Sequence, residues 1–264
     1  VGTGALDANT TGTNSVAVGH AALSAATTAT YNVAVGANAM GNAIVTGDHN
    51  VGIGHAALAL ITSGTRCVAV GNLAGDELTT ATATTLVGRA AGHAITTGSY
   101  NVGIGDSALS VVTTGAGNTT INPWNNVGSY VPAYDVAAAD NNRYVCGSTG
   151  VTNAYVQVAW TVVSDIRDKT DFAPVPHGLD FINQIEPTAY RYKRERSDTE
   201  GHGPLRYGFK AQEVLALEGE DSVIVDSDDP EKLRFNDQSM IAVLTNAIKE
   251  LSAKVTELEG KLNG

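Results

Sequence analysis

A short pattern of branched and small residues recurs along the first half of the chain. Its form is V-[AG]-[VI]-G-x-x-A, as in "VAVGANA", and alternating Val or Ile with Ala or Gly is typical of a short strand. Thr-, Gly-, Asn- and Ser-rich turns separate the copies. The pattern glycines are 17 or 18 residues apart, at Gly19, Gly36, Gly54, Gly71, Gly88 and Gly105. A fixed period of this kind predicts a repeat array.

One repeat cannot fold alone, because its few apolar side chains do not offset an ordering cost of about 1–2 kcal/mol per residue. The units must therefore stack, either along one chain as a solenoid or with three chains wrapped around a common axis. The small residues at the sixth and seventh positions of the motif indicate close backbone approach. They favour the second arrangement, so residues 1–117 are expected to form an intertwined, triple-stranded β-helix-like shaft of a mainly β fibrous trimer.

The period is lost after residue 117, and aromatic residues appear in its place. Trp124, Tyr130 and Tyr134 stand among Asn and Asp residues in the segment 118–163, which is predicted to be a distal β tip. Aromatic rings beside polar groups suit stacking on sugars, which makes these three residues candidates for receptor binding. The alternative is that the rings only close the end of the shaft. The stretch "AYVQVAWTVV" predicts one last strand.

The end of the chain has a different period. Apolar residues spaced alternately by three and four follow an aspartate cap at Asp237: Ile241, Leu244, Ile248, Leu251, Val255, Leu258 and Leu262. This a/d heptad predicts a coiled-coil helix over about 238–263. Ile and Val at a with Leu at d favour a dimer when considered alone, so the helix itself does not predict a trimer.

Composition divides the chain at "WTVVSDIRDK". All seven lysines and all four phenylalanines follow Val163. The net charge of −11 excludes a basic nucleic-acid surface, and no apolar stretch is long enough for a membrane span. Cys67 and Cys146 have no metal or redox spacing and are interpreted as buried thiols. Because the chain lacks an initiating Met, it is expected to be the C-terminal piece of a longer protein.

A serine and a lysine lie at this boundary. Ser164 precedes Lys169 by five residues, and a neutral lysine can take the proton of a serine hydroxyl and make it a nucleophile. In an extended strand the two side chains would point to opposite faces, so this chemistry requires a turn. The pair alone is weak evidence, because most such spacings are ordinary surface residues.

Three ordered motifs strengthen the case. S-D-x-R-x-K is present at Ser164–Lys169, G-L-x-F-I-x-x-I-x-P-x-x-Y at Gly178–Tyr190 and G-F-x-A-Q-E-V at Gly208–Val214. Residues 164–264 thereby resemble the C-terminal intramolecular chaperone of phage tail spikes and fibres, the S74 peptidase family known from endosialidases. The segment "RFNDQSM" is more polar than the resemblance leads us to expect.

The resemblance implies an α+β domain that trimerises, sets the register of the fibre before it and then releases itself by autoproteolysis. Ser164 is then the nucleophile and Lys169 the general base, with the cut at Ser164–Asp165. A cut at Val163–Ser164 remains open, because that attack passes through a less strained ring. Asp165 is expected to supply geometry or a proton for the leaving group. Arg167, Gln212 and Glu213 are candidate supporting residues, or ordinary surface and packing residues.

The repeats themselves resemble phage tail-fibre shafts and the heads of trimeric autotransporter adhesins. The combination predicts a homotrimeric tail-fibre tip that binds a host cell-surface glycan or protein, folds in the host cytoplasm and stays in the virion without its released chaperone. No cofactor or metal is expected, and the missing G-x-x-x-x-G-K-[ST] loop makes ATP binding doubtful. The alternative is a polysaccharide depolymerase, although no carboxylate pair stands out in the repeats. A bacterial adhesin is disfavoured because no C-terminal membrane anchor follows.

Overall fold

The computed structural model describes residues 1–124, 128–134, 136–151, 154–157, 162, 164–193, 196–219 and 222–263. The chain divides into two compact units, Val1–Ala154 and Tyr155–Gly264. Each unit has its own hydrophobic core. The two are therefore described separately.

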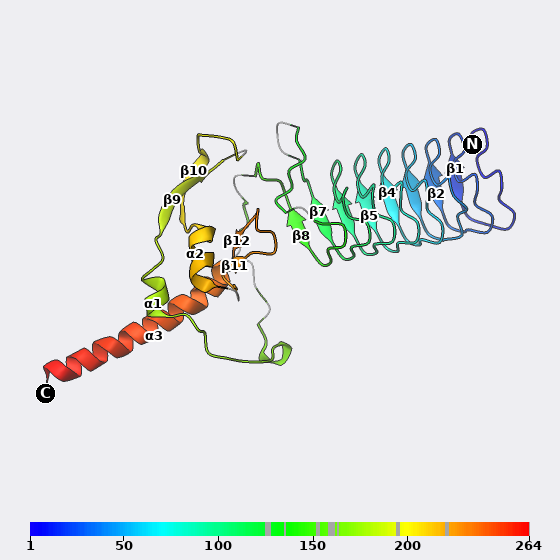
Figure 1. Cartoon of the computed structure of the whole chain (residues 1–264). Helices are drawn as coiled ribbons and strands as arrows, with labels where there is room; N and C mark the ends of the chain where they lie inside the picture. Colours follow the sequence, from blue (N-terminus) through cyan, green and yellow to red (C-terminus); the bar gives the residue numbers. More distant parts are fainter. Residues whose placement is uncertain are drawn as a thin grey trace. The chain divides into compact units, whose positions relative to one another are not determined.

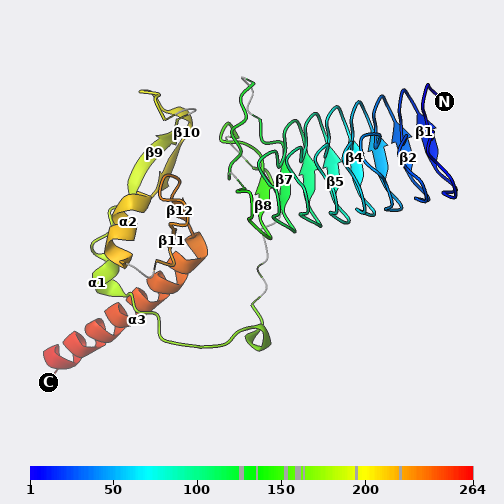
Figure 2. The same cartoon turned by 45° about the vertical axis from the view of Figure 1, so that its right-hand side comes forward.

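The first unit is a β-solenoid whose turns follow one another along a single chain (Figures 1 and 2). Its strands form one eight-stranded sheet in sequence order, and every neighbouring pair is parallel. Equivalent repeat residues pair, as Val51 does with Val68. The strands are β1 Val16–Val18, β2 Val33–Val35, β3 Val51–Ile53, β4 Val68–Val70, β5 Thr85–Val87, β6 Val102–Ile104, β7 Thr119–Ile121 and β8 Tyr144–Cys146.

The solenoid is the other of the two stacking arrangements that the sequence left open, and it differs from the intertwined shaft that the small residues favoured. Within the chain, those small residues allow close contact between successive turns. A Cβ at Gly54 would lie 2.3 Å from the carbonyl oxygen of Gly71, and Gly54 has a φ of +133°. Ala57 and Ala74 are fully buried inside the coil. The close approach seen here is therefore between consecutive turns of one chain.

Each strand places its middle residue in the core and its two outer residues on the other face of the sheet. In β1 only the central Ala17 is buried, and Leu58, Leu86 and Ile95 fill the interior of the coil. Cys67 is fully buried, and burial raises the pKa of its thiol. Cys146 is exposed, so the prediction of a buried thiol is wrong there. It ends β8 at the outward position where other strands have Val or Ile.

Buried polar side chains stand one residue before five of the strands, β2, β3, β5, β6 and β7. Asn50 is fully buried; its Oδ1 accepts from the Cys67 backbone N–H at 3.0 Å, and its Nδ2 donates to the Gly64 carbonyl at 2.8 Å. The equivalent residues of other turns repeat this scheme at Asn32, Asn101 and Asn118. These side chains thus satisfy buried backbone groups that the strands leave unpaired.

The sheet continues beyond residue 117. Thr119 of β7 pairs with Tyr144 of β8, with a longer excursion of the chain between them than in the earlier turns. This excursion holds one isolated antiparallel bridge, Trp124 with Tyr130, and a second bridge joins its Pro132 to Ser148 after β8. Of the predicted last strand, residues 154–157 form no strand, 162 has no assigned element, and 158–161 and 163 lie outside the described residues.

The second unit is a small α+β body. A 3₁₀ turn, Ile166–Asp168, precedes α1 Leu179–Ile182, the antiparallel pair β9 Thr188–Tyr192 and β10 His202–Gly208, α2 Ala211–Glu218, the antiparallel pair β11 Val225–Asp226 and β12 Arg234–Phe235, and α3 Asp237–Leu262. The core contains Phe181, Val214, Ile224, Val225, Met240 and Val243. Phe235 of the polar segment before α3 stacks on Phe209, with ring centroids 5.3 Å apart.

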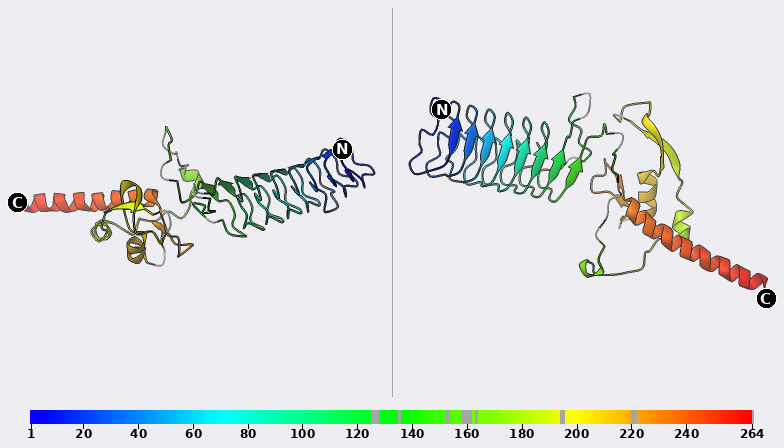
Figure 3. Two further views of the ribbon diagram at one scale, coloured as in Figure 1. Left: turned by 90° about the horizontal axis from the view of Figure 1, so that it is seen from above. Right: turned by 180° about the vertical axis from the view of Figure 1, so that it is seen from behind.

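The helix α3 packs on this core only through its first half. Met240, Val243 and Ala247 are its buried residues, and the cap is Asn236 rather than Asp237, because the Asn236 side chain accepts from the N–H groups of Gln238 and Ser239. All seven heptad residues are exposed, from Leu244 at 39% to Leu262 at 84%. Figure 3 shows the helix extending as one rod beyond the rest of its unit. Among the described residues, no helix is both long and apolar enough to span a membrane.

Candidate functional site at the start of the C-terminal unit

The residues of the S-D-x-R-x-K motif form a tight turn. The Lys169 backbone N–H donates to the Ile166 carbonyl at 3.3 Å and closes the 3₁₀ turn that follows Ser164. This turn brings the two ends of the motif together, and the Lys169 Nζ donates to the Ser164 Oγ at 2.6 Å. The side-chain pair that an extended strand would have separated is thus in hydrogen-bond contact.

Asp165 and Arg167 hold the turn in this shape. The Asp165 carboxylate accepts from the Arg167 backbone N–H at 2.9 Å and thereby caps the turn. The same carboxylate accepts from the Arg167 side chain, through Nε at 3.0 Å and through Nη2 at 2.5 Å. These hydrogen bonds lower the pKa of Asp165 and raise that of Arg167. An ionised, fork-bound carboxylate is a poor proton donor, so the geometry favours a positioning role for Asp165.

The pair is open to solvent in the single chain. Ser164 and Lys169 are both exposed. A general base must be neutral, and burial of a lysine favours the neutral form. The turn thus brings the two side chains as close together as the chemistry needs. Their burial would require contact with a surface outside the turn.

Gln212 and Glu213 lie at the start of α2 and are both exposed. The Glu213 carboxylate pairs with Lys210 Nζ at 2.5 Å, which raises the pKa of Lys210. Neither residue has a hydrogen bond to Ser164 or Lys169 in the described parts of the chain. The structure therefore does not bring Gln212 or Glu213 into contact with the pair Ser164 and Lys169, here called the dyad.

Two glutamates outside the three motifs hold backbone groups of this unit. The Glu250 carboxylate of α3 accepts from the Leu179 N–H at 2.8 Å, and a Cβ on Gly178 would lie within 2.0 Å of that carboxylate. Glu218 accepts from three consecutive backbone N–H groups at 2.7–2.9 Å, those of Val223, Ile224 and Val225. Neither glutamate was identified from the sequence, since nothing in the spacing links them to these distant backbone groups.

The three candidate receptor residues lie near the last turns of the solenoid. The Trp124 and Tyr130 rings meet edge to face, with centroids 6.4 Å apart. The Trp124 indole Nε1 is buried, and no acceptor for it is found among the described residues. Tyr134 packs against the solenoid core, donates its hydroxyl to Asp140 at 2.9 Å and lies under the Arg143 guanidinium. Tyr134 therefore has a structural role at the end of the coil.

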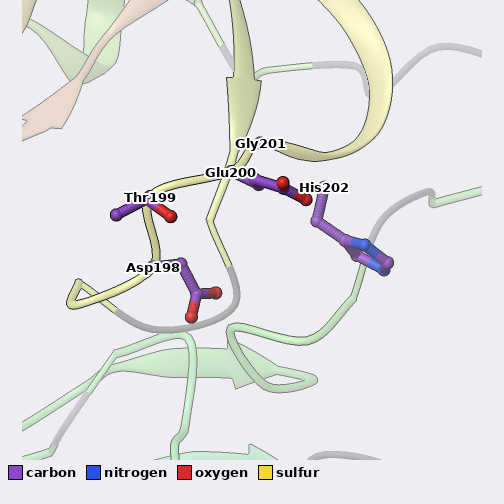
Figure 4. Close-up of a pocket in the computed structure, with 5 residues that line it drawn as sticks. All are labelled: Asp198, Thr199, Glu200, Gly201 and His202. Atoms are coloured by element: carbon purple, nitrogen blue, oxygen red, sulfur yellow. The ribbon is translucent and has the colours of Figure 1, made fainter.

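The pockets of the second unit do not adjoin the dyad. One, at the turn before β10, is lined by Asp198–His202, and Figure 4 shows the Thr199 and His202 side chains pointing to opposite sides of the loop. A larger, aromatic one lies between β9, β10 and β12 and includes Tyr190, Tyr192 and Phe235. No group of three or more potential metal ligands occurs within the part of the chain that the structure covers.

Comparison with known families agrees with the turn geometry. Residues 164–223 match the family model described as chaperone of endosialidase, Peptidase_S74. The match begins at Ser164 and ends before β11, so it contains the dyad but not α3. Searches of curated proteins and of solved structures returned no significant match. The second unit of this chain therefore contains an S74-type intramolecular chaperone domain, preceded by a β-solenoid.

Proposed function

We propose that this chain belongs to a phage tail fibre, whose S74-type domain assembles three copies and then cuts itself off at Ser164. The observation that carries the proposal is the 2.6 Å contact between Lys169 Nζ and Ser164 Oγ at the first residues of the matched family segment. The position supports it as well, since the dyad begins the small C-terminal domain that would be discarded.

The proposed chemistry is an acyl transfer. The neutral Lys169 amine takes the proton of the Ser164 hydroxyl, and Oγ attacks a neighbouring peptide carbonyl carbon. The C–N bond breaks, the leaving amine receives a proton from Lys169, and water then hydrolyses the ester. Asp165 and Arg167 hold the turn that keeps the two reacting side chains in contact.

Two bonds are candidates for the cut. The family resemblance implies Ser164–Asp165, where Oγ would attack the carbonyl of its own residue through a strained four-membered ring. Attack on the carbonyl of residue 163 would pass through a five-membered ring; that residue lies outside the described part of the chain. Both cuts would leave the solenoid on one product and the chaperone on the other.

Assembly would supply the burial that the dyad lacks. Two exposed apolar surfaces suit contact with other copies of the chain. One is the heptad seam of α3, and the other is the outer face of the solenoid sheet, where Val16, Val18, Ile53, Val87 and Ile104 are 38–50% exposed. Burying such surfaces contributes about 25 cal/mol per Å². A lysine enclosed at a subunit contact would lose its proton more readily.

Near-identical turns explain why a detachable chaperone is useful. Three solenoids that pack sheet to sheet could slip by one turn and still bring Val or Ile opposite Val or Ile. A C-terminal domain that joins the chains at one end sets the register before the sheets pack. Once it is removed, the fibre cannot easily reverse its assembly, and its stability becomes kinetic.

In the virion, the remaining trimer would present the solenoid and the Trp124–Tyr130 region to a receptor on the host cell. The Trp124 and Tyr130 rings, which meet edge to face, are the candidate contact surface there. The receptor would be a glycan or a protein.

The direct test is the intact mass of the purified chain under denaturing conditions. We expect two fragments split beside Ser164 for the wild type, and one uncut chain for Ser164→Ala and for Lys169→Ala. The matched controls are Ser197→Ala and Lys193→Ala, exposed residues of the same unit, which should be cut normally. An uncut wild-type chain would refute the self-cleavage.

A further inference from the structure

One edge of the solenoid displays large aromatic and basic side chains at the same place in four of five successive turns. The place is the residue two positions before strands β2 to β6: Tyr31, His49, Arg66 and Tyr100 occupy it, and Ala83 occupies it in the turn between Arg66 and Tyr100. Their backbone N–H groups donate to carbonyls of the preceding turn at 2.9–3.2 Å. The four residues therefore form one column, here called the edge strip, about 19 Å long at the spacing of neighbouring strands.

The backbone of the edge strip is in the left-handed region. The φ angles are +58° at Tyr31, +63° at His49, +58° at Arg66 and +62° at Tyr100. This conformation costs free energy for every L-residue and suits Gly and Asn best. Those are the residues that the outermost turns use at the equivalent positions, Asn14, Gly117 and Asn142. Four of the five turns between them instead keep bulky side chains in this strained conformation, and the fifth has Ala83.

A second left-handed column shows how such strain is normally offset. Leu23, Met40 and Leu58 have φ angles of +49° to +53° and are fully buried, so each gains the free energy of core burial. In the edge strip, Tyr31 is 53% exposed and Tyr100 is 63% exposed. Their strain is not offset by burial in the folded chain. Uncompensated strain of this kind is a mark of a functional surface.

The edge strip combines stacked rings with an arginine that has no acidic partner among the described residues. The Tyr31 and His49 rings stack with centroids 5.0 Å apart and an angle of 18°. One turn further, the Arg66 side chain has no hydrogen bond or ion pair with any residue that the structure describes, whereas Arg89 makes a two-pronged contact with Asp106. A guanidinium without a counter-ion is notable on a chain of net charge −11.

The groups beside the strip are polar and mostly uncharged. Thr65 and Thr82 lie in the neighbouring column with their hydroxyls 3.5 Å apart. The one carboxylate of that column, Asp48, accepts from the backbone N–H and the hydroxyl of Thr30 and is therefore already satisfied. The strip thus combines ring faces, hydroxyls and one available cation.

We propose that the edge strip binds a carboxylated polysaccharide, with sugar rings stacked on Tyr31, His49 and Tyr100 and a carboxylate held by Arg66. Aromatic faces and hydroxyls suit the two sides of a pyranose, and a guanidinium suits a carboxylate in a forked contact. The inference rests on the proposed function, since it gives the fibre shaft a receptor surface of its own. It places that surface on the side of the solenoid, apart from the Trp124 region.

The test is calorimetric titration of the uncut Ser164→Ala chain with alginate, pectate and hyaluronan, and with neutral dextran as the comparison ligand. We expect at least one of the acidic polymers to bind and dextran not to. Tyr31→Asn, Tyr100→Asn and Arg66→Gln should each weaken that binding by about tenfold. Because Asn suits a left-handed backbone, the two Tyr variants should unfold at the same or a higher temperature than the parent chain.

The matched controls are Tyr144→Asn and Arg89→Gln. Tyr144 is equally exposed, at 64%, but lies on the sheet face, so its variant should bind normally, as should Arg89→Gln. If no acidic polymer binds, or if the strip variants bind like the parent, the proposal is overturned. If the strip variants bind the polymer normally but no longer assemble into an oligomer, the edge strip is a subunit contact, and the proposal is again overturned. Self-cleavage is read separately, so neither result decides the proposed function.

Discussion

The two units of this chain differ in how much of their apolar surface is buried in a core. In the solenoid every turn is bonded to the next, and a continuous core of fully buried residues runs along the coil. The second unit has a small core, and its longest element exposes an entire heptad seam. The first unit is stabilised by a core that runs its whole length, whereas the second leaves most of its longest helix outside its core. Substitutions of the same kind should therefore have different effects in the two units.

The largest contrast is expected for leucine truncation. Leu58→Ala removes a fully buried side chain of the solenoid and should lower the free energy of unfolding by about 2–5 kcal/mol. Leu258→Ala removes a side chain that is 58% exposed on α3 and should leave the unfolding of the isolated chain within about 0.5 kcal/mol. It should instead weaken self-association. Urea unfolding and sedimentation, both on the uncut Ser164→Ala background, measure the two effects.

Glycine substitution should have opposite signs in the two units. Gly71→Ala would place a Cβ 2.3 Å from the Gly88 carbonyl oxygen at a φ of +142°, which should cost about 2–4 kcal/mol. Gly260→Ala in α3 meets no atom within 4 Å and should stabilise the helix by up to about 1 kcal/mol. The observables are the urea midpoint for Gly71→Ala and helical circular dichroism for Gly260→Ala. Equal effects would mean that the solenoid turns are not closely packed.

The interior asparagines should matter more than surface ones. Asn50→Ala would leave the Cys67 N–H and the Gly64 carbonyl without their partners inside the coil, at a cost of about 1–3 kcal/mol. Asn42→Ala, at an exposed position of the same unit, is the control and should be near neutral. Thermal unfolding of both variants, compared with the parent, measures the difference. If Asn50→Ala unfolds at the same temperature as the parent, the buried asparagines do not stabilise the solenoid as described.

The smallest effects concern two carboxyl groups with opposite pKa shifts. Burial raises the pKa of Asp76 in the solenoid, whereas the Arg167 hydrogen bonds lower that of Asp165. The contribution of Asp76 to the stability of the folded solenoid is present below the ordinary Asp pKa. It is lost as the pH rises through the raised pKa of the folded state. Asp76→Asn should therefore stabilise the solenoid at pH 7 by less than about 1 kcal/mol and give no gain at pH 3.

The stabilisation by Asp165 depends on pH in the opposite direction. Its stabilisation of the turn is present above the ordinary Asp pKa and is lost as the pH falls through the lowered value. Asp165→Asn should therefore loosen the contact between Ser164 and Lys169 at neutral pH and slow self-cleavage, whereas Asp168→Asn, in the same turn, is the control. The measurement is the fraction of cut chain at fixed times. Normal cleavage of Asp165→Asn would remove its positioning role.

The sequence predicted the repeat, the heptad helix and the S74-type domain, because each has a periodic or ordered signal. It did not predict that the turns stack along one chain, since small residues permit close approach both within a chain and between chains. The spacing of Ser164 and Lys169 pointed to the dyad, and the Asp165 cap supplied the turn that spacing alone could not. The contacts of Glu250 and Glu218 join distant segments and have no local pattern. The edge strip became visible only with the backbone angles of Tyr31 and Tyr100.

Native mass spectrometry of the wild-type chain, purified without denaturant, tests the central claim most directly. The account predicts a complex of three chains that each end beside Ser164, with the C-terminal fragment free or only loosely held. The Ser164→Ala chain should give three full-length copies, which would show that assembly does not require the cut. A wild-type protein that remains a full-length monomer would contradict both the assembly and the self-release.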